Sequence, residues 1–207
     1  MAESMLKRIE SELERIGLLL EHDAGLPSIT TLVAGAPIRS SWWGHPLGHR
    51  IYDLINELAS GSGKLSGKIV NGKVTYVHPR LWDAFLVVVQ DKDPKRVHGL
   101  SQLALALWGE VERRGVVRGD ALRDSRFAPA PALKPAFREL ELRLLVHTEG
   151  VHTESGAHAK VLRAWSAWAA DHHPGAERPE PAAARAALAR AVATLGENSG
   201  REPQVPW

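Results

Sequence analysis

The sequence predicts an α+β fold that is mainly helical and carries small β-hairpins. Helices are indicated by apolar residues that recur at three- and four-residue steps, as at Leu6, Ile9 and Leu13. Hairpins are indicated where this period gives way to short β-favouring runs around a turn, first after Ser60. The 207 residues, of which 44% are hydrophobic and 24% charged, suffice for one large or two small globular domains.

Residues 1–78 predict a three-helix unit that ends in a hairpin. The expected helices cover residues 3–22, 28–34 and 46–60. The hairpin is expected over residues 64–77 and turns at Asn71-Gly72, because type I′ turns need a positive φ at both central positions. Three helices followed by a hairpin are the order of a winged helix, in which the hairpin is the wing.

Residues 79–175 predict a second unit of this kind, so the expected architecture is tandem winged-helix units. Its helices are expected over residues 79–89, 102–114, 118–123, 134–142 and 159–169, with a short strand at 116–117. A second hairpin is expected from Leu144 to Thr153, with its turn at Glu149-Gly150. Residues 176–207 predict an Ala/Pro-rich helix, over 181–195, and a tail.

The composition limits the classes of function. Because the chain has no cysteine, disulfides, thiolate metal sites and cysteine nucleophiles are excluded. The N-terminus lacks the apolar core of a signal peptide, and the apolar run 84–89 is too short to cross a bilayer. We therefore expect a cytoplasmic protein with no membrane partner. The net charge of +2 and the pI near 9.0 permit a polyanionic partner without requiring one.

Candidates for contact with nucleic acid lie on the loop that enters the third helix and on the first hairpin. They are Arg39, Trp42, Trp43, His45, Arg50, Lys64, Lys68 and Lys73. Rings stack on bases, cations bind phosphates, and a helix N-terminus adds the positive end of its dipole. Two alternatives stay open: the tryptophans fill the core, and the lysines protect strand edges from aggregation.

This pattern predicts weak binding of duplex DNA without strong sequence preference, and a protein partner is the alternative. The phosphate contacts are expected from Arg39, Arg50, Lys64, Lys68 and Lys73. The basic loop over residues 91–98 is interpreted differently: its Lys92, Lys95 and Arg96 are expected to be solvated surface side chains.

The segment His-Thr-Glu occurs twice at a spacing of five, and it supplies the catalytic candidates. These are His147, Glu149, His152, Glu154 and His158. Imidazoles and carboxylates bind zinc, iron or manganese and act as general acids and bases, so an enzyme remains an alternative. However, the spacing matches no standard metal motif. We therefore expect a structural hairpin without metal or cofactor, whose polar groups pair with Arg143, Lys160 or Arg163.

Three segments carry a resemblance to known proteins. They are SSWWGHPLGHRIYDLINEL, GKVTYVHPRLWDAFL and LRLLVHTEGVHTESGAHAKVLRAW. Together they resemble an uncharacterised bacterial protein family, over most of residues 25–170, which is distantly similar to the AlkZ-type winged-helix DNA glycosylases. The resemblance implies DNA binding and, at most, excision of alkylated bases. The glycosylases carry a Gln-x-Gln or Gln-x-Asp motif that Gln90, Gln102 and Gln204 do not fit, so no catalytic residue is carried over.

Overall fold

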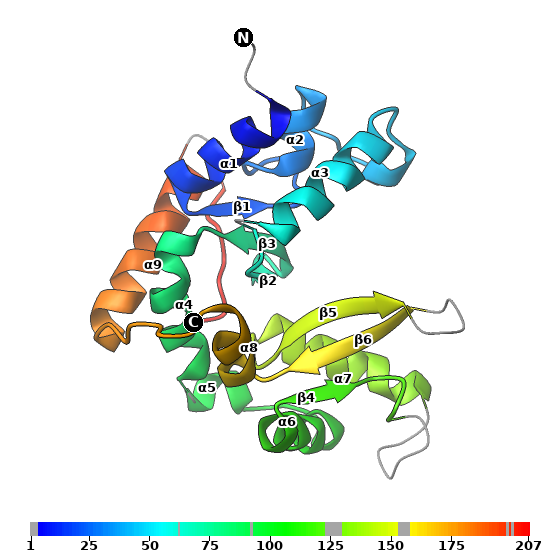
Figure 1. Cartoon of the computed structure of the whole chain (residues 1–207), viewed down its shortest axis with the longest axis vertical. Helices are drawn as coiled ribbons and strands as arrows, with labels where there is room; N and C mark the ends of the chain where they lie inside the picture. The colour runs from blue at the N-terminus through cyan, green and yellow to red at the C-terminus, as the bar shows by residue number, and fades with distance from the viewer. Residues whose placement is uncertain are drawn as a thin grey trace. The chain divides into compact units, whose positions relative to one another are not determined.

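The structure, a computed structural model, divides into two compact units. It describes residues 4–61, 63–91, 93–122, 130–152, 158–197, 199 and 201–207. The first unit is Met1–Phe85 with Arg178–Val205, and the second is Leu86–Glu177 with Pro206–Trp207. Among the described residues helices predominate and each unit contains a three-stranded antiparallel sheet, so the predicted α+β class is confirmed (Figure 1).

The first unit alternates helices and strands around one sheet. Its elements run in the order α1 (Met5–Ile16), β1 (Leu18–Leu20), α2 (Ile29–Ala34), the 3-10 helix η1 (Trp42–Gly44), α3 (Gly48–Ser60), β2 (Ser66–Val70) and β3 (Lys73–Val77). The strands lie in the order β1-β3-β2, so the middle strand is the last in sequence. The expected hairpin is confirmed: φ is 54° at Asn71 and 66° at Gly72, as a type I′ turn requires.

The first helix is shorter than the sequence predicted. Ser4 caps its start, with its side chain accepting from the amide of Lys7. It ends at Gly17, whose left-handed φ of 91° also turns the chain. The expectation of helix up to residue 22 is wrong, since Leu18–Leu20 form β1 and pair with β3. A run of buried leucines has no period of its own, so the strand partner decides its conformation.

The core of the first unit lies between the helices and the sheet. It includes Ile9, Leu13, Leu19, Ile29, Ile51, Leu54, Leu58 and Tyr76. The chain then continues through the 3-10 helix η2 (Pro79–Leu81) into α4 (Trp82–Gln90), within which the boundary between the units falls. The predicted C-terminal helix is α9 (Pro181–Gly196), and it packs against α1 and β1 of this first unit.

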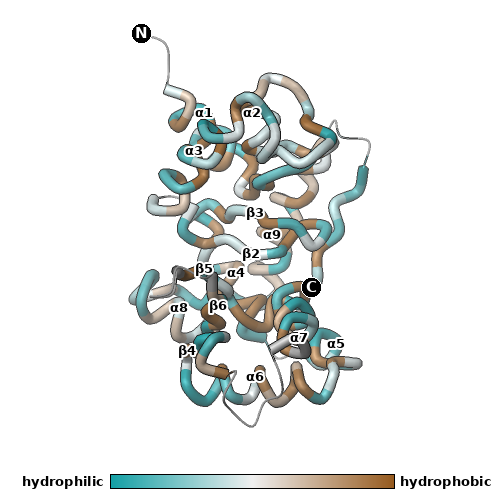
Figure 2. The backbone as a smooth tube through the Cα atoms, turned by 90° about the vertical axis from the view of Figure 1, so that its right-hand side faces the viewer, coloured by the Kyte–Doolittle hydropathy of each residue, from teal (hydrophilic) through white to brown (hydrophobic). Residues whose placement is uncertain are grey.

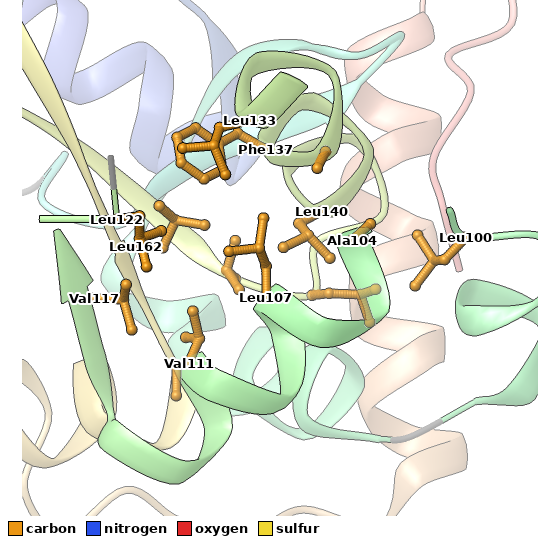
Figure 3. Close-up of a cluster of buried hydrophobic side chains, with 14 residues drawn as sticks. Leu100, Ala104, Leu107, Val111, Val117, Leu122, Leu133, Phe137, Leu140 and Leu162 are labelled. Carbon is orange, nitrogen blue, oxygen red and sulfur yellow. The ribbon is translucent and has the colours of Figure 1, made fainter. Parts of the chain in front are cut away.

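The second unit has a similar order of elements. They are α5 (Pro94–Val97), α6 (Gln102–Arg114), β4 (Val116–Arg118), α7 (Ala130–Leu142), β5 (His147–His152), β6 (His158–Arg163) and α8 (Trp165–His172). The strands lie in the order β4-β6-β5. Apolar side chains from α6, α7 and the sheet form its core, with Leu107, Leu140 and Leu162 fully buried (Figure 3).

Three expectations for the second unit are wrong. β5 continues through Glu149-Gly150 instead of turning there. Residues 159–163 belong to β6, so the helix expected over 159–169 begins only at Trp165. β6 is the central strand, and its adjacent residues Val161 and Leu162 are both buried, so its pattern resembles a helical stripe. The short helix expected over residues 118–123 is instead the end of β4 followed by a turn over 119–122, and residue 123 lies outside the described part.

The most apolar stretch of the chain lies in α4. Its residues 84–89 are all apolar, and brown in Figure 2 marks hydrophobic residues. In the described ranges, neither α4 nor any other helix combines the length and the hydrophobicity that crossing a bilayer requires.

Candidate functional site

An aromatic and cationic surface lies at the start of α3. Trp42 and Trp43 form η1 just before this helix, and their rings stack with centroids 4.3 Å apart and planes at 21°. Trp42 is buried, whereas Trp43 is 64% exposed. Arg39, before η1, and Arg50, in the first turn of α3, are both exposed. The two tryptophans therefore differ in role: one is part of the core, as the alternative interpretation held, and the other faces solvent.

His45 is a turn residue at this surface. Its Nδ1 accepts a hydrogen bond from the amide of Leu47 at 3.2 Å, and its own amide donates to the carbonyl of Trp42. These bonds join η1 to the first residues of α3, so the imidazole shapes the loop that presents Trp43.

The exposed half of α3 carries two stripes of different character. His49, Tyr52 and Asn56 follow one another at helical spacing and offer polar hydrogen-bonding groups. The neighbouring stripe starts with the cation Arg50 and continues with the anions Asp53 and Glu57. Tyr52 was not singled out from the sequence, although its place off the apolar stripe of Ile51, Leu54 and Leu58 was a sufficient signal of its exposure.

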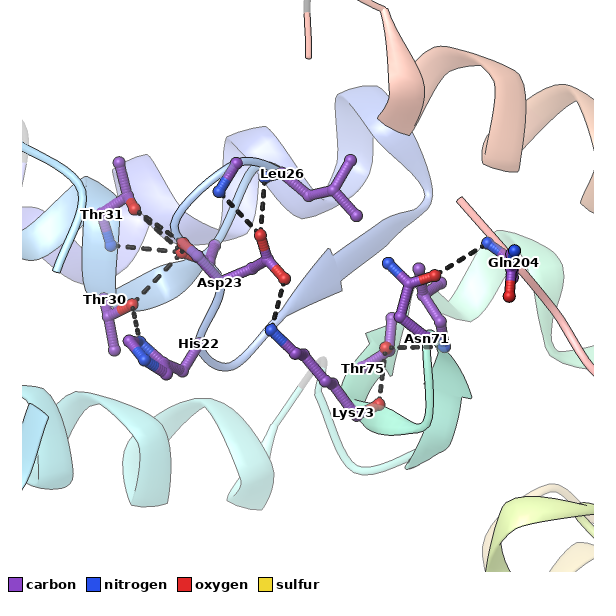
Figure 4. Close-up of polar contacts among 12 residues, drawn as sticks. His22, Asp23, Leu26, Thr30, Thr31, Asn71, Lys73, Thr75 and Gln204 are labelled. Atoms are coloured by element: carbon purple, nitrogen blue, oxygen red, sulfur yellow. Dashed lines mark hydrogen bonds and ion pairs between the residues drawn. The ribbon is translucent and has the colours of Figure 1, made fainter. Parts of the chain in front are cut away.

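The lysines of the first hairpin have different surroundings. Lys64 is exposed between α3 and β2, and Lys68 is half-buried on β2. Lys73 donates to Oδ2 of Asp23 at 2.6 Å, and Asp23 is only 3% exposed (Figure 4). The other carboxylate oxygen of Asp23 accepts the amide of Leu26 at 2.9 Å. Lys73 is thus committed to holding the segment between β1 and α2, and its charge is already compensated.

The tip of the same hairpin is bound by the C-terminal segment. The amide of Asn71 donates to the carbonyl of Gln204 at 2.8 Å, and the amide of Gln204 donates to Oδ1 of Asn71 at 2.9 Å (Figure 4). This reciprocal pair spans 133 residues of sequence. It occupies the amide and the side-chain oxygen of Asn71 at the turn of the hairpin.

In the second unit, His147 is the first residue of β5, and its side chain is buried. Its ring meets that of Trp165 edge-on, with centroids 5.3 Å apart, and lies 5.9 Å from Trp168. Its Nδ1 is 3.3 Å from Oε1 of Glu149, and Nε of Arg163 lies 3.6 Å from the same oxygen. The pKa of Glu149 lies below its ordinary value, mainly because of the imidazole of His147. The charge of Arg163 lowers this pKa further, whereas burial of the carboxyl raises it.

The turn expected at Glu149-Gly150 does not form, so His147 and His152 lie on one continuous strand, β5, which runs unbroken between them. Residues five apart in one strand lie on opposite faces of the sheet, so positions 147 and 152 do not share a face. Position 152 pairs instead with position 158, while Glu154 lies outside the described residues. Within the described ranges, no three His, Asp or Glu side chains are grouped so that they could hold a metal ion. The contacts of His147 and Glu149 favour the structural interpretation of this segment.

A cavity of about 200 Å³ lies elsewhere in the second unit, with Trp108 and Trp165 among its lining residues. Arg96 also lines it and is 5% exposed, so the expectation that Arg96 is a solvated surface residue is wrong. Its guanidinium donates to the carbonyls of Val89 and Leu144 at 3.0 and 3.3 Å. The cavity is smaller than the roughly 300–1,000 Å³ of typical ligand pockets, and Arg96 is used to satisfy backbone carbonyls.

Comparisons with known protein families, with curated proteins and with solved structures found no match to this chain.

Proposed function

We propose that the protein binds duplex DNA through its first unit, and that this unit is a winged helix with α3 facing the DNA. The order helix, strand, helix, helix, strand, strand with the sheet order β1-β3-β2 agrees with such a unit. The observation that carries the proposal is the exposed face of α3. It follows a buried aromatic anchor and presents polar side chains and a cation to solvent, as a helix that enters a groove does.

The charge distribution supports weak binding. Arg39, Arg50 and Lys64 are the exposed cations near α3, whereas Lys73 is neutralised by Asp23. Asp53 and Glu57 on the same helix repel phosphates. The second unit has the sheet order β4-β6-β5 and fits a second winged-helix-like unit. The aromatic and cationic surface at α3 belongs to the first unit.

Replacing Arg39, Arg50 and Lys64 together with glutamine is expected to abolish most of the duplex binding. If these three cations neutralise phosphates in the native protein, its affinity falls roughly fortyfold between about 50 and 200 mM salt, because bound counterions are released. The triple variant retains little of this salt dependence. Fluorescence anisotropy of a labelled duplex at low salt measures both quantities.

The matched control removes the same charge from another face of the first unit. Lys7 and Arg8 on α1 and Arg190 on α9 are exposed, and their glutamine variant should bind DNA almost as the native protein does. Equal losses in the two triple variants would mean that only net charge matters. Absence of binding at micromolar protein and low salt would refute the proposed function.

Removing the two acids of α3 is expected to strengthen DNA binding. In the variant Asp53→Asn/Glu57→Gln, two anions that repel phosphates are lost, and each contributes roughly 0.5 kcal/mol at about 8 Å in water. Affinity should rise about two- to fivefold in the same anisotropy assay. The control Glu14→Gln/Glu180→Gln changes two exposed acids away from α3 and should leave the affinity nearly unchanged. An equal gain in both variants would contradict the assignment of α3.

A further inference from the structure

The surface at α3 contains a rigid aromatic platform, defined here as Trp43 with Tyr52. Tyr52 is 44% exposed, and its ring centroid lies 5.4 Å from that of Trp43 at an interplanar angle of 43°. Beneath Trp43 the ring of Trp42 is 7% exposed and belongs to the core cluster of the unit. The buried ring of Trp42 belongs to the core, and the exposed ring of Trp43 is held at the surface by stacking on it.

The backbone fixes this platform relative to α3. Gly48 begins the helix directly against η1, and a Cβ at this position would lie 3.0 Å from the carbonyl oxygen of Trp43 and 3.1 Å from that of Trp42. A larger residue would push η1 away from the helix. Because the rings are held before any ligand arrives, little conformational entropy is lost when a flat ligand stacks on them.

The size of the platform distinguishes between two kinds of partner. Trp43, Leu47 and Tyr52 are the large exposed hydrophobic residues among the described part of the first unit. A stable protein interface buries roughly 1,200–2,000 Å², which is more than three side chains supply. A single nucleobase needs only one ring face. The exposed cations Arg39 and Arg50, one on each side of Trp43 in sequence, complement the phosphates that flank such a base.

We propose that the first unit binds DNA preferentially where a base is unpaired, and that the unpaired base stacks on the platform of Trp43 and Tyr52. Within a duplex the faces of each base are covered by its neighbours, so only base edges are accessible to a bound helix. A base at a bulge, a bubble or a strand end exposes its face. This inference rests on the proposed function, because the same helix α3 must lie against the DNA.

The test compares three fluorescent probes of equal length: a fully paired duplex, the same duplex with a three-nucleotide bubble, and the single strand. The native protein should bind the bubble roughly 5- to 160-fold more tightly than the duplex, which corresponds to the roughly 1–3 kcal/mol found for stacking of one base on an aromatic residue. Trp43→Ala should remove this preference, so that the variant binds the bubble and the paired duplex with equal affinity. A 2-aminopurine at the unpaired position should be quenched on binding the native protein only.

Two further variants separate stacking from folding. Trp43→Leu keeps an apolar side chain without an aromatic face and should behave as Trp43→Ala does. Tyr52→Phe keeps the ring and should retain the preference for the bubble. Thermal unfolding followed by circular dichroism checks that each variant is folded, which the 64% exposure of Trp43 leads us to expect.

The outcomes distinguish the inference from the proposed function. Equal affinity for duplex and bubble would overturn the inference and leave the proposed function standing. Binding to none of the three probes would refute both. A preference for the bubble that survives Trp43→Ala would overturn the role of the platform. Self-association that depends on Trp43, without any effect of Trp43→Ala on DNA binding, would assign the platform to a protein contact and also overturn it.

Discussion

Replacing Arg96 with alanine is expected to lower the free energy of unfolding by roughly 3–5 kcal/mol. The buried guanidinium of Arg96 donates to the carbonyls of Val89, Asp91 and Leu144. Without it these carbonyls lose a charged donor, and a side-chain-sized hole opens beside the cavity near Trp108. Urea denaturation followed by tryptophan fluorescence measures the loss.

Two other variants make this prediction specific. Lys95 is adjacent in sequence but exposed, so Lys95→Ala should change the free energy of unfolding by less than about 0.5 kcal/mol. Arg96→Lys keeps the charge but has no planar fork to reach several carbonyls, so its loss should be intermediate. If Arg96→Ala were no more damaging than Lys95→Ala, Arg96 would be a surface residue, as the sequence alone predicted.

A loss of similar size, roughly 3–5 kcal/mol, is expected for Asp23→Ala in the first unit. The carboxylate of Asp23 accepts the amides of Gly25 and Leu26 at 2.7 and 2.9 Å and the ammonium of Lys73 at 2.6 Å. Alanine leaves all three donors without this acceptor. Asp23→Asn can still accept the two amides, so it should lose less in the same urea denaturation experiment.

The effect of Asp23 should also depend on pH. Burial alone would raise the pKa of Asp23, but the hydrogen bonds from Lys73, Gly25 and Leu26 outweigh it, so the pKa lies below its ordinary value of 3.8. The stabilisation is therefore fully present above pH 3.8 and is lost as the pH falls through the lowered pKa. Urea denaturation between about pH 5 and about pH 3 should show a steeper loss for the native protein than for Asp23→Asn. Parallel profiles would contradict this.

Local signals in the sequence predicted the elements that depend on local interactions. The turn at Asn71-Gly72 was predicted because few residues adopt two consecutive positive φ angles. The helices capped by Ser28 and Ser101 were predicted because these hydroxyls satisfy the first helical amides. In contrast, β1 and β6 were assigned to helices. Each is a short strand with adjacent buried residues and a partner distant in sequence, and no local period distinguishes it from a buried helix.

The candidate site was predictable to a similar extent. Trp43 and Arg50 could be selected as exposed residues on a loop and a polar helix face. The sequence could not show which of Trp42 and Trp43 is buried and which is exposed. Two adjacent tryptophans carry the same local signal, and only the position of the neighbouring helix distinguishes them. The pairing of Lys73 with Asp23 joins residues 50 positions apart, and no local pattern indicates it.

The division of the chain has a consequence for its synthesis. The first unit is completed only by Arg178–Val205, whose helix α9 packs against α1 and β1. A ribosome must translate residues 86–177 in between, which takes about 5–20 seconds at roughly 5–20 residues per second. During that interval the nascent chain carries an amphipathic helix and an apolar strand that still lack their cover, while nearly all of the second unit is being made. The first unit thus matures only after nearly all of the second unit has been made, and until then part of its apolar surface stays exposed.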